Sequence, residues 1–311
     1  MRTWHDARRE VVTASDAYCL FEDVEPGGFK TLWSLYYEKR GELDSQPENN
    51  AMRMGTLLEP IVLQLAQEQL GCEVHPWDEH SHVWAHESVT VETVQKGDAV
   101  IPFLRLGRVG STPDAVTEHG APVEAKTTSE WSGDIKFSWA LQLTIQMRHL
   151  GADHGYLAVL VQGRQFELCR LEYDPELYAA IEQRAERFWQ DVVAGNEPKV
   201  DWSKVGRDVR RLHPSDDGQE LDDPGLEPML ALIHEAKRSV AAAKSRADAL
   251  EAELLHRLGS AAGARAGAWK VSAKTSKPSP GTLVTADMVG TYVGARAGFR
   301  AIRITPPKEY K

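Results

Sequence analysis

The feature that most constrains the fold is an aspartate followed, ten positions later, by a Glu-x-Lys pattern: Asp114, then Glu124-Ala125-Lys126. Residues 121–128 have the character of a short strand. Because side chains alternate between the two faces of a strand, Glu124 and Lys126 share one face. We therefore predict that two carboxylates and one amine come together where neighbouring strands end.

This grouping indicates a particular chemistry. Two carboxylates beside a lysine form an oxygen-lined site for a hard divalent cation, next to an amine that orients or activates water. Such a site suits the hydrolysis of phosphodiesters. The same Asp/Glu-x-Lys form recurs at 134–136 and 235–237. The first follows a Ser-Gly loop signal and the second lies in an Ala-rich helical stretch, so neither is predicted to lie on a strand.

A third carboxylate, Glu59, lies upstream in a helical pattern. Apolar residues recur with helical spacing over 54–70, and a glycine follows. Because proline is tolerated in the first turn of a helix, Pro60 predicts that this helix begins near Leu58 or Glu59. For Glu59 itself two interpretations stay open: a metal ligand, or an ordinary first-turn acid favoured by the helix dipole.

Residues 137–150 are typical of a second amphipathic helix, capped by Gly151. Gln142, Gln146 and His149 fall on one stripe of it. A solvated face is the default interpretation of such a stripe. Its position directly after the Glu-x-Lys strand favours the alternative, a polar face that looks into a cleft.

The predicted organisation is a core domain over 1–195, a linker over 196–225 that is rich in proline and acids, and a C-terminal part over 226–311. Because strands and helices alternate in the predicted core, the expected fold class is α/β. Further expected elements are strands at 156–161 and 166–171, helices at 175–194 and 226–258, and a small basic α/β tail at 268–304.

Bulk properties narrow the class of protein. No apolar run approaches the roughly 20 residues of a membrane span, and the first residues lead into no secretory signal. The three cysteines, Cys19, Cys72 and Cys169, share no motif spacing. They predict free thiols in a reducing cytoplasm.

The formal net charge of −10 argues against general affinity for polyanions. Binding to nucleic acid requires only a local basic surface, however. From Arg257 onward basic residues far outnumber the two acids, Asp287 and Glu309. This tail either follows a DNA backbone or simply forms a solvated basic surface.

Four motifs fall together in the first half of the chain: Gly55-x-x-x-Glu59, Ser111-Thr112-Pro113-Asp114, Glu124-Ala125-Lys126 and Gln142. On these motifs, from about Arg8 to Val193, the chain resembles the YqaJ-type viral recombinases, relatives of phage lambda exonuclease within the restriction-endonuclease-like superfamily of PD-(D/E)xK nucleases. The resemblance implies a central mixed sheet flanked by helices. One departure is Thr144, at a position where the family often has a second glutamine.

The resemblance implies a restriction-endonuclease-like core and a metal-dependent DNA exonuclease that acts 5′ to 3′ on duplex ends in phage or prophage recombination. Lys126 would orient or deprotonate the attacking water, and Gln142 would position the water or the scissile phosphate. The expected ligands of Mg²⁺ or Mn²⁺ are Asp114, Glu124, the Ala125 carbonyl and Glu59.

The resemblance also implies that Arg8, Ser15 and Thr112 hold a terminal 5′-phosphate. It implies double-stranded DNA ends as substrate, a single-strand annealing protein of the RecT or Bet type as partner, a homotrimer, and the cytoplasm of a bacterial host as location. The alternatives are a structure-specific endonuclease and a non-catalytic module that binds DNA ends on the same scaffold.

Overall fold

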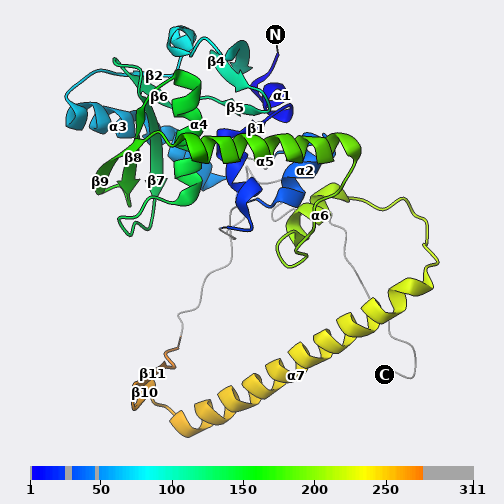
Figure 1. The fold of residues 1–311 in the computed structure, drawn as a ribbon. Coiled ribbons are helices and arrows are strands. Elements are labelled where there is room, and N and C mark those ends of the chain that lie inside the picture. Colours follow the sequence, from blue (N-terminus) through cyan, green and yellow to red (C-terminus); the bar gives the residue numbers. More distant parts are fainter. Residues whose placement is uncertain (1, 25–29, 46–48, 276–311) are drawn as a thin grey trace, which may run out of the picture. The chain divides into compact units, whose positions relative to one another are not determined.

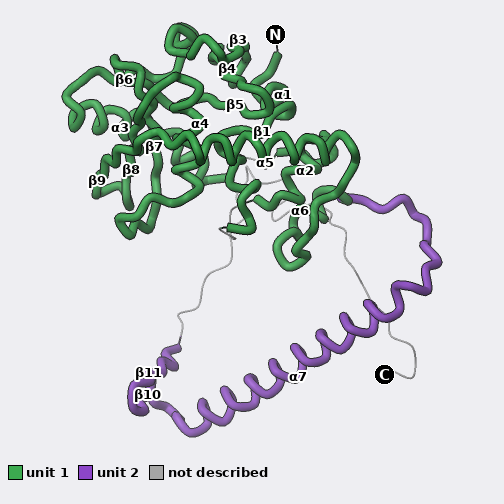
Figure 2. The backbone as a smooth tube through the Cα atoms, in the orientation of Figure 1, with its two compact units in different colours: residues 1–213 green, residues 214–311 purple. Residues whose placement is uncertain are grey.

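The structure is a computed structural model that describes residues 2–24, 30–45 and 49–275. It divides into two compact units, Met1–His213 and Pro214–Lys311 (Figure 1 and Figure 2). All of the residues predicted to form the site belong to the first unit.

A five-stranded mixed sheet forms the centre of the first unit, in the order β2-β6-β7-β8-β9. β7 and β8 are parallel, and the other neighbours are antiparallel. The crossover that a parallel pair requires is provided by a helix, α4. The strands are β2 (Val74–Pro76), β6 (Ala115–Thr117), β7 (Pro122–Thr128), β8 (His154–Val161) and β9 (Gln165–Glu172).

Two helices, α3 (Asn50–Leu70) and α4 (Phe137–Leu150), cover opposite faces of this sheet (Figure 1). Val123 of β7 packs in the cluster that contains α3 residues, whereas Leu157 of β8 packs with α4 residues. Because side chains alternate along β7, Glu124 points to the face opposite Val123, which is the side of α4.

A second sheet, in the order β1-β5-β4-β3, lies in the same unit, with β1 and β5 parallel. Its β3–β4 hairpin accounts for most of the stretch 78–104, for which no sequence pattern predicted an element. Residues 112–114 join β5 of this sheet directly to β6 of the central sheet. The second sheet consists of β1 (Val12–Thr13), β3 (Thr90–Lys96), β4 (Ala99–Leu106) and β5 (Val109–Ser111).

The main apolar core of the unit lies where α4 meets α5 and η1. Leu141, Ile145 and Ile181 are fully buried there, and burial of such side chains is the dominant stabilising contribution. The remaining elements are α1 (Trp4–Arg9), η1 (Ala14–Phe21), α2 (Leu32–Lys39), η2 (Ser81–Trp84), α5 (Pro175–Ala194) and α6 (Gly206–Leu212).

The predicted fold class, α/β with a mixed central sheet flanked by helices and a long C-terminal helix, is confirmed. The predicted start of the Glu59 helix is wrong. α3 begins at Asn50, because the side chain of Asn49 caps it by accepting a hydrogen bond from the Met52 N–H at 3.0 Å. Pro60 therefore lies inside the helix, and Glu59 lies near its middle.

The second unit contains η3 (Pro224–Leu226), α7 (Glu227–Leu258) and an antiparallel hairpin of β10 (Gly263–Ala266) and β11 (Trp269–Ser272). The predicted linker, 196–225, contains α6 and η3. Of the predicted tail at 268–304, the part from residue 276 onward lies outside the described residues.

Among the described residues, no helix is both long enough and apolar enough to cross a membrane.

Candidate active site

The two predicted metal ligands on neighbouring strands lie where β6 and β7 pair. Ala115 of β6 is opposite Val123 of β7, so Asp114, one residue earlier, lies opposite Glu124. The backbone N–H of Ala125 donates to Asp114 Oδ2 at 2.9 Å. Opposed residues of an antiparallel pair place their side chains on one face. The structure therefore brings Asp114 and Glu124 together.

Glu124 is the centre of a hydrogen-bonded cluster, with a side chain only 2% exposed. Its Oε1 accepts from Lys126 Nζ at 2.5 Å and from Gln142 Nε2 at 2.6 Å. Lys126 Nζ also donates to Gln142 Oε1 at 3.0 Å. These three contacts close a ring, which holds the carboxylate, the amine and the amide in one arrangement.

The polar stripe of α4 lies in the interior and is not a solvated face. Gln146 is fully buried and donates from Nε2 to Glu124 Oε2 at 2.6 Å. His149 is also fully buried, and its Nδ1 lies 2.7 Å from Ser111 Oγ. Burial, with a smaller effect of Arg148, lowers the pKa of His149 to about 3, so this imidazole is neutral. The sequence predicts Gln146 as a member of this stripe, but no motif predicts its contact with Glu124.

Three carboxylates crowd the site. Burial raises the pKa of Asp114 well above its usual range, and the charges of Glu124 and Glu59 raise it further. Burial likewise raises the pKa of Glu59, with Glu124 acting in the same direction. Glu59 therefore lies within electrostatic reach of the other two, although it comes from the middle of α3 rather than from its first turn.

Lys126 is a cation in this arrangement. Burial lowers its pKa, but the charges of Glu124 and Asp114 raise it by more, and the pKa lies above its usual value. A neighbouring metal cation would lower the pKa of this amine. With only the protein's own groups present, the pKa of Lys126 is raised.

Within the described ranges, no three His, Cys, Asp or Glu side chains come close enough to form a complete metal site. Asp114 and Glu124 nevertheless supply the carboxylate oxygens that Mg²⁺ and Mn²⁺ prefer. The mutual repulsion that raises the pKa of Asp114 is also what a divalent cation relieves. These donor atoms are therefore of the type that binds such an ion.

A cavity of about 160 Å³ connects these acids with the N-terminal segment of the chain. Arg8, Ser15 and Thr112 line it together with Asp114 and Gln142. The residues predicted to hold a phosphate and two of those predicted for the chemistry thus share one cavity. Its other lining residues are Trp4, Thr13, Ala14, Lys96, Phe103 and Ser111.

Trp4 contacts three other residues that line this cavity. The guanidinium of Arg8 lies 4.3 Å from the centre of the Trp4 ring, and Lys96 Nζ lies 5.2 Å from it. Trp4 Nε1 donates to Thr112 Oγ1 at 3.4 Å. Lys96 thus adds a second cation to the cavity. Lys96 was not predicted as a site residue, because it lies at the end of β3 and no local motif marks it.

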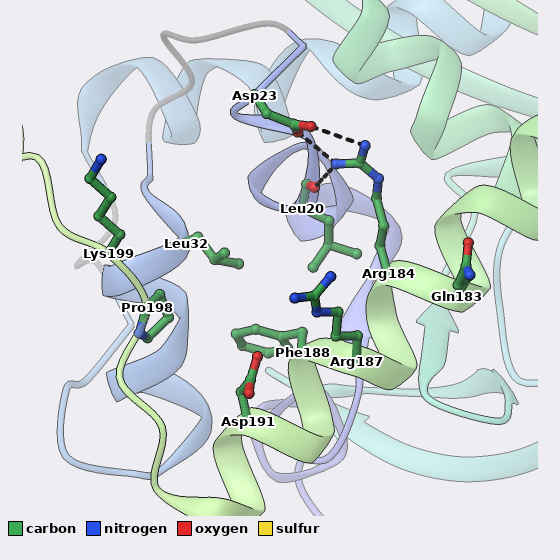
Figure 3. Close-up of a pocket in the computed structure, with 10 residues that line it drawn as sticks. All are labelled: Leu20, Asp23, Leu32, Gln183, Arg184, Arg187, Phe188, Asp191, Pro198 and Lys199. Atoms are coloured by element: carbon green, nitrogen blue, oxygen red, sulfur yellow. Dashed lines mark hydrogen bonds and ion pairs between the residues drawn. The ribbon is translucent and has the colours of Figure 1, made fainter.

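A larger cavity, of about 540 Å³, lies between η1, α2 and α5 (Figure 3). Arg184 closes one side: it donates to the two carboxylate oxygens of Asp23 at 2.6 and 3.1 Å, and to the Leu20 carbonyl at 2.7 Å. None of the predicted site residues lines this cavity, so the candidate active site is the smaller one.

Part of the chain matches a known protein family, and the chain is similar to several solved structures. A family model, the YqaJ-like viral recombinase domain, matches residues 3–151. No curated protein matches the chain. Among solved structures, the chain is similar to an alkaline exonuclease (LHK-Exo) from Laribacter hongkongensis, with 19% identity, 67% of this chain and 98% of that chain covered, and a TM-score of 0.44. It is also similar to a phage related exonuclease from Haemophilus somnus, with 10% identity, coverage of 60% and 96%, and a TM-score of 0.43.

Proposed function

We propose, from the match of residues 3–151 to the YqaJ-like viral recombinase domain, that the chain is a metal-dependent DNA exonuclease that hydrolyses phosphodiesters at duplex ends, 5′ to 3′, in phage or prophage recombination. One observation carries the proposal: a single cavity is lined both by Arg8, Ser15 and Thr112 and by Asp114 and Gln142. A terminal phosphate held by the first group would leave the next phosphodiester beside the second.

The proposed resident ion is Mg²⁺ or Mn²⁺. Asp114 and Glu124 would hold it, with Glu59 and the Ala125 carbonyl as further ligands. When bound, such an ion neutralises charge on the phosphate and lowers the pKa of water near it. For Glu124 to bind it, the carboxylate must give up part of its contact with Lys126, which now occupies Oε1 at 2.5 Å.

The protein's own groups would then act on the substrate directly. Lys126, released from Glu124, would donate a hydrogen bond that orients the attacking water. Gln142 would position the water or the scissile phosphate, since its amide already bridges Lys126 and Glu124. Buried Gln146 would keep hold of the other oxygen of Glu124 and so preserve the direction of the carboxylate.

The decisive experiment compares linear and closed-circular duplex DNA, each with Mg²⁺ and with a chelator. We expect the linear DNA alone to be degraded, with mononucleotides released from 5′ ends, and the chelator to stop the reaction. Nicking of the circles would instead support a structure-specific endonuclease. Binding of linear ends without cleavage would support a non-catalytic end-binding module.

Replacement of Arg8 by alanine should remove the preference for phosphorylated 5′ ends. A hydrogen bond to a charged group contributes about 1.5–3 kcal/mol, so the ratio of kcat/KM between phosphorylated and hydroxyl ends should fall by about 10- to 100-fold. The neighbouring Arg9 is exposed and does not line the cavity, and Arg9→Ala should keep the parental ratio. Equal activity of the parent on both ends would contradict the phosphate pocket.

The proposal extends to the assembly in which the enzyme works. As the resemblance implies, the partner would be a single-strand annealing protein of the RecT or Bet type, which would receive the strand that degradation exposes. The enzyme itself would act as a homotrimer around its duplex substrate.

A further inference from the structure

A buried ion-pair network contacts Arg8 and Thr13, two of the residues that line the cavity. Its centre is Asp16 of η1, whose side chain is 6% exposed. The carboxylate accepts from four donors: Thr13 Oγ1 at 2.7 Å, Lys30 Nζ at 3.1 Å, Lys39 Nζ at 3.3 Å and Arg8 Nη2 at 3.4 Å. Lys30 Nζ also donates to Glu38 Oε2 at 2.6 Å.

Burying such a network costs free energy. Removing a charged group from water costs several kcal/mol even after relaxation, and buried ion pairs are often no more stabilising than apolar residues of the same volume. Burial raises the pKa of Asp16, but Lys39, Arg8 and Lys30 together lower it well below its usual value. Asp16 is therefore ionised, and stability alone does not explain the arrangement.

The network holds the polar groups that face the cavity. Asp16 contacts the guanidinium of Arg8, while Lys39 Nζ donates to the Arg8 backbone carbonyl at 2.7 Å. Through Thr13 Oγ1, which lies 3.2 Å from Ser15 Oγ, Asp16 also orders the hydroxyl pair. Arg8 Nη2 donates to Ser15 Oγ at 3.1 Å. Arg8, Thr13 and Ser15 all line the cavity.

The network contains one more positive than negative group. Arg8, Lys30 and Lys39 are three cations, whereas Asp16 and Glu38 are two carboxylates. Burial lowers the pKa of Lys39 to about 8, and the positive charges of Arg8 and Lys30 act in the same direction. An anion at Arg8 would relieve this excess of positive charge.

We propose that Asp16 is a positioning residue for end selection: it holds Arg8, Thr13 and Ser15 in the arrangement that accepts a terminal phosphate, and Thr13 is a further phosphate contact. The inference rests on the proposed function, because it assumes that the cavity receives a DNA end. Asp16 does not itself touch the substrate. It acts through the guanidinium and the two hydroxyls.

The test is Asp16→Asn, measured as kcat and KM on a duplex that carries either a 5′-phosphate or a 5′-hydroxyl. We expect the ratio of kcat/KM between the two ends to fall at least about tenfold, chiefly through KM for the phosphorylated end. Activity on the hydroxyl end should change little, because the cluster around Glu124 is untouched. A general loss of structure would lower both activities together.

Asp208→Asn is the matched control. Asp208 is also buried and ion-paired, since it accepts from Ser34 Oγ at 2.7 Å and from Arg211 Nη1 at 2.9 Å, but it does not line the cavity. The Asp208→Asn variant removes the same charge and should leave the ratio of kcat/KM between the two ends at its parental value. Thr13→Val is a second, uncharged test variant, and it should also lower the ratio.

The possible failures are distinct. A parent enzyme without any preference for phosphorylated ends would contradict the phosphate pocket of the proposed function. A parent with that preference, combined with parental ratios in both Asp16→Asn and Thr13→Val, would overturn the positioning role alone. If Asp16→Asn does not fold, the Thr13→Val ratio decides between the two results.

Discussion

Replacement of Lys126 by methionine should abolish exonuclease activity while leaving the fold intact. Methionine keeps much of the length of lysine but has neither the charge nor the hydrogen-bond donors that reach Glu124 and Gln142. Loss of one positioned donor or proton-transfer group typically costs about 10²- to 10⁴-fold in rate. The measurement is the initial rate of nucleotide release from 5′-phosphorylated linear duplex with Mg²⁺, beside a thermal unfolding curve.

The chain supplies its own control for this variant. Lys136 ends a second Asp-x-Lys pattern, but it is exposed and precedes α4 instead of lying on β7. Lys136→Met should therefore retain activity within about a factor of two, as expected for a surface change of about ±0.5 kcal/mol. A Lys126→Met enzyme that degrades DNA at the parental rate would show that the amine has no part in the reaction.

Asp114→Asn should remove activity and stabilise the metal-free protein at the same time. Asparagine retains an oxygen to accept the Ala125 N–H but carries no charge, so the repulsion from Glu124 and Glu59 disappears. The folded-state pKa of Asp114 is raised, so this acid favours the folded state at low pH and destabilises it as pH rises through that pKa. The stability gain in the variant should therefore be larger at neutral than at acidic pH.

The measurement combines activity with unfolding temperature. We expect a loss of about 10²-fold or more in rate and a rise in unfolding temperature of about 2–4 °C for each 1 kcal/mol of repulsion removed. Added Mg²⁺ should stabilise the parent and not the variant. Asp134→Asn, in the exposed loop, is the control for both readouts. If Mg²⁺ stabilised Asp114→Asn as well as the parent, the assignment of Asp114 as a ligand would fail.

The elements that position the site were predictable where the pattern is local. The alternation along β7 placed Glu124 and Lys126 on one face, and the helical spacing over 137–150 defined α4 together with its glycine cap. Both patterns depend on neighbours within one element, so nothing distant overrides them. The same holds for α5, which Asp174 caps at its start and Gly195 caps at its end.

The parts that could not be predicted depend on contacts between distant residues or on competing local rules. In α3 the cap at Asn49 starts the helix before Pro60, so the proline that was expected to mark the first turn lies inside it. Gln146 lies 22 residues from Glu124, and only the packing of α4 against β7 shows that they meet. Asp16 depends likewise on Lys30 and Lys39, which no local motif connects to it.

Thr112 and Asp114 lie on the short segment that joins β5 to β6, with a single residue between them. If the first contacts a DNA terminus and the second the bond to be cut, the interval between them is fixed by covalent geometry and not by movement of separate parts. The segment then sets the distance between the bound terminus and the bond that is cut, so every turnover releases a product of the same length. Inserting one residue there would change the length of the released product, whereas substitutions of Arg8 or Ser15 would change only how the terminus is bound.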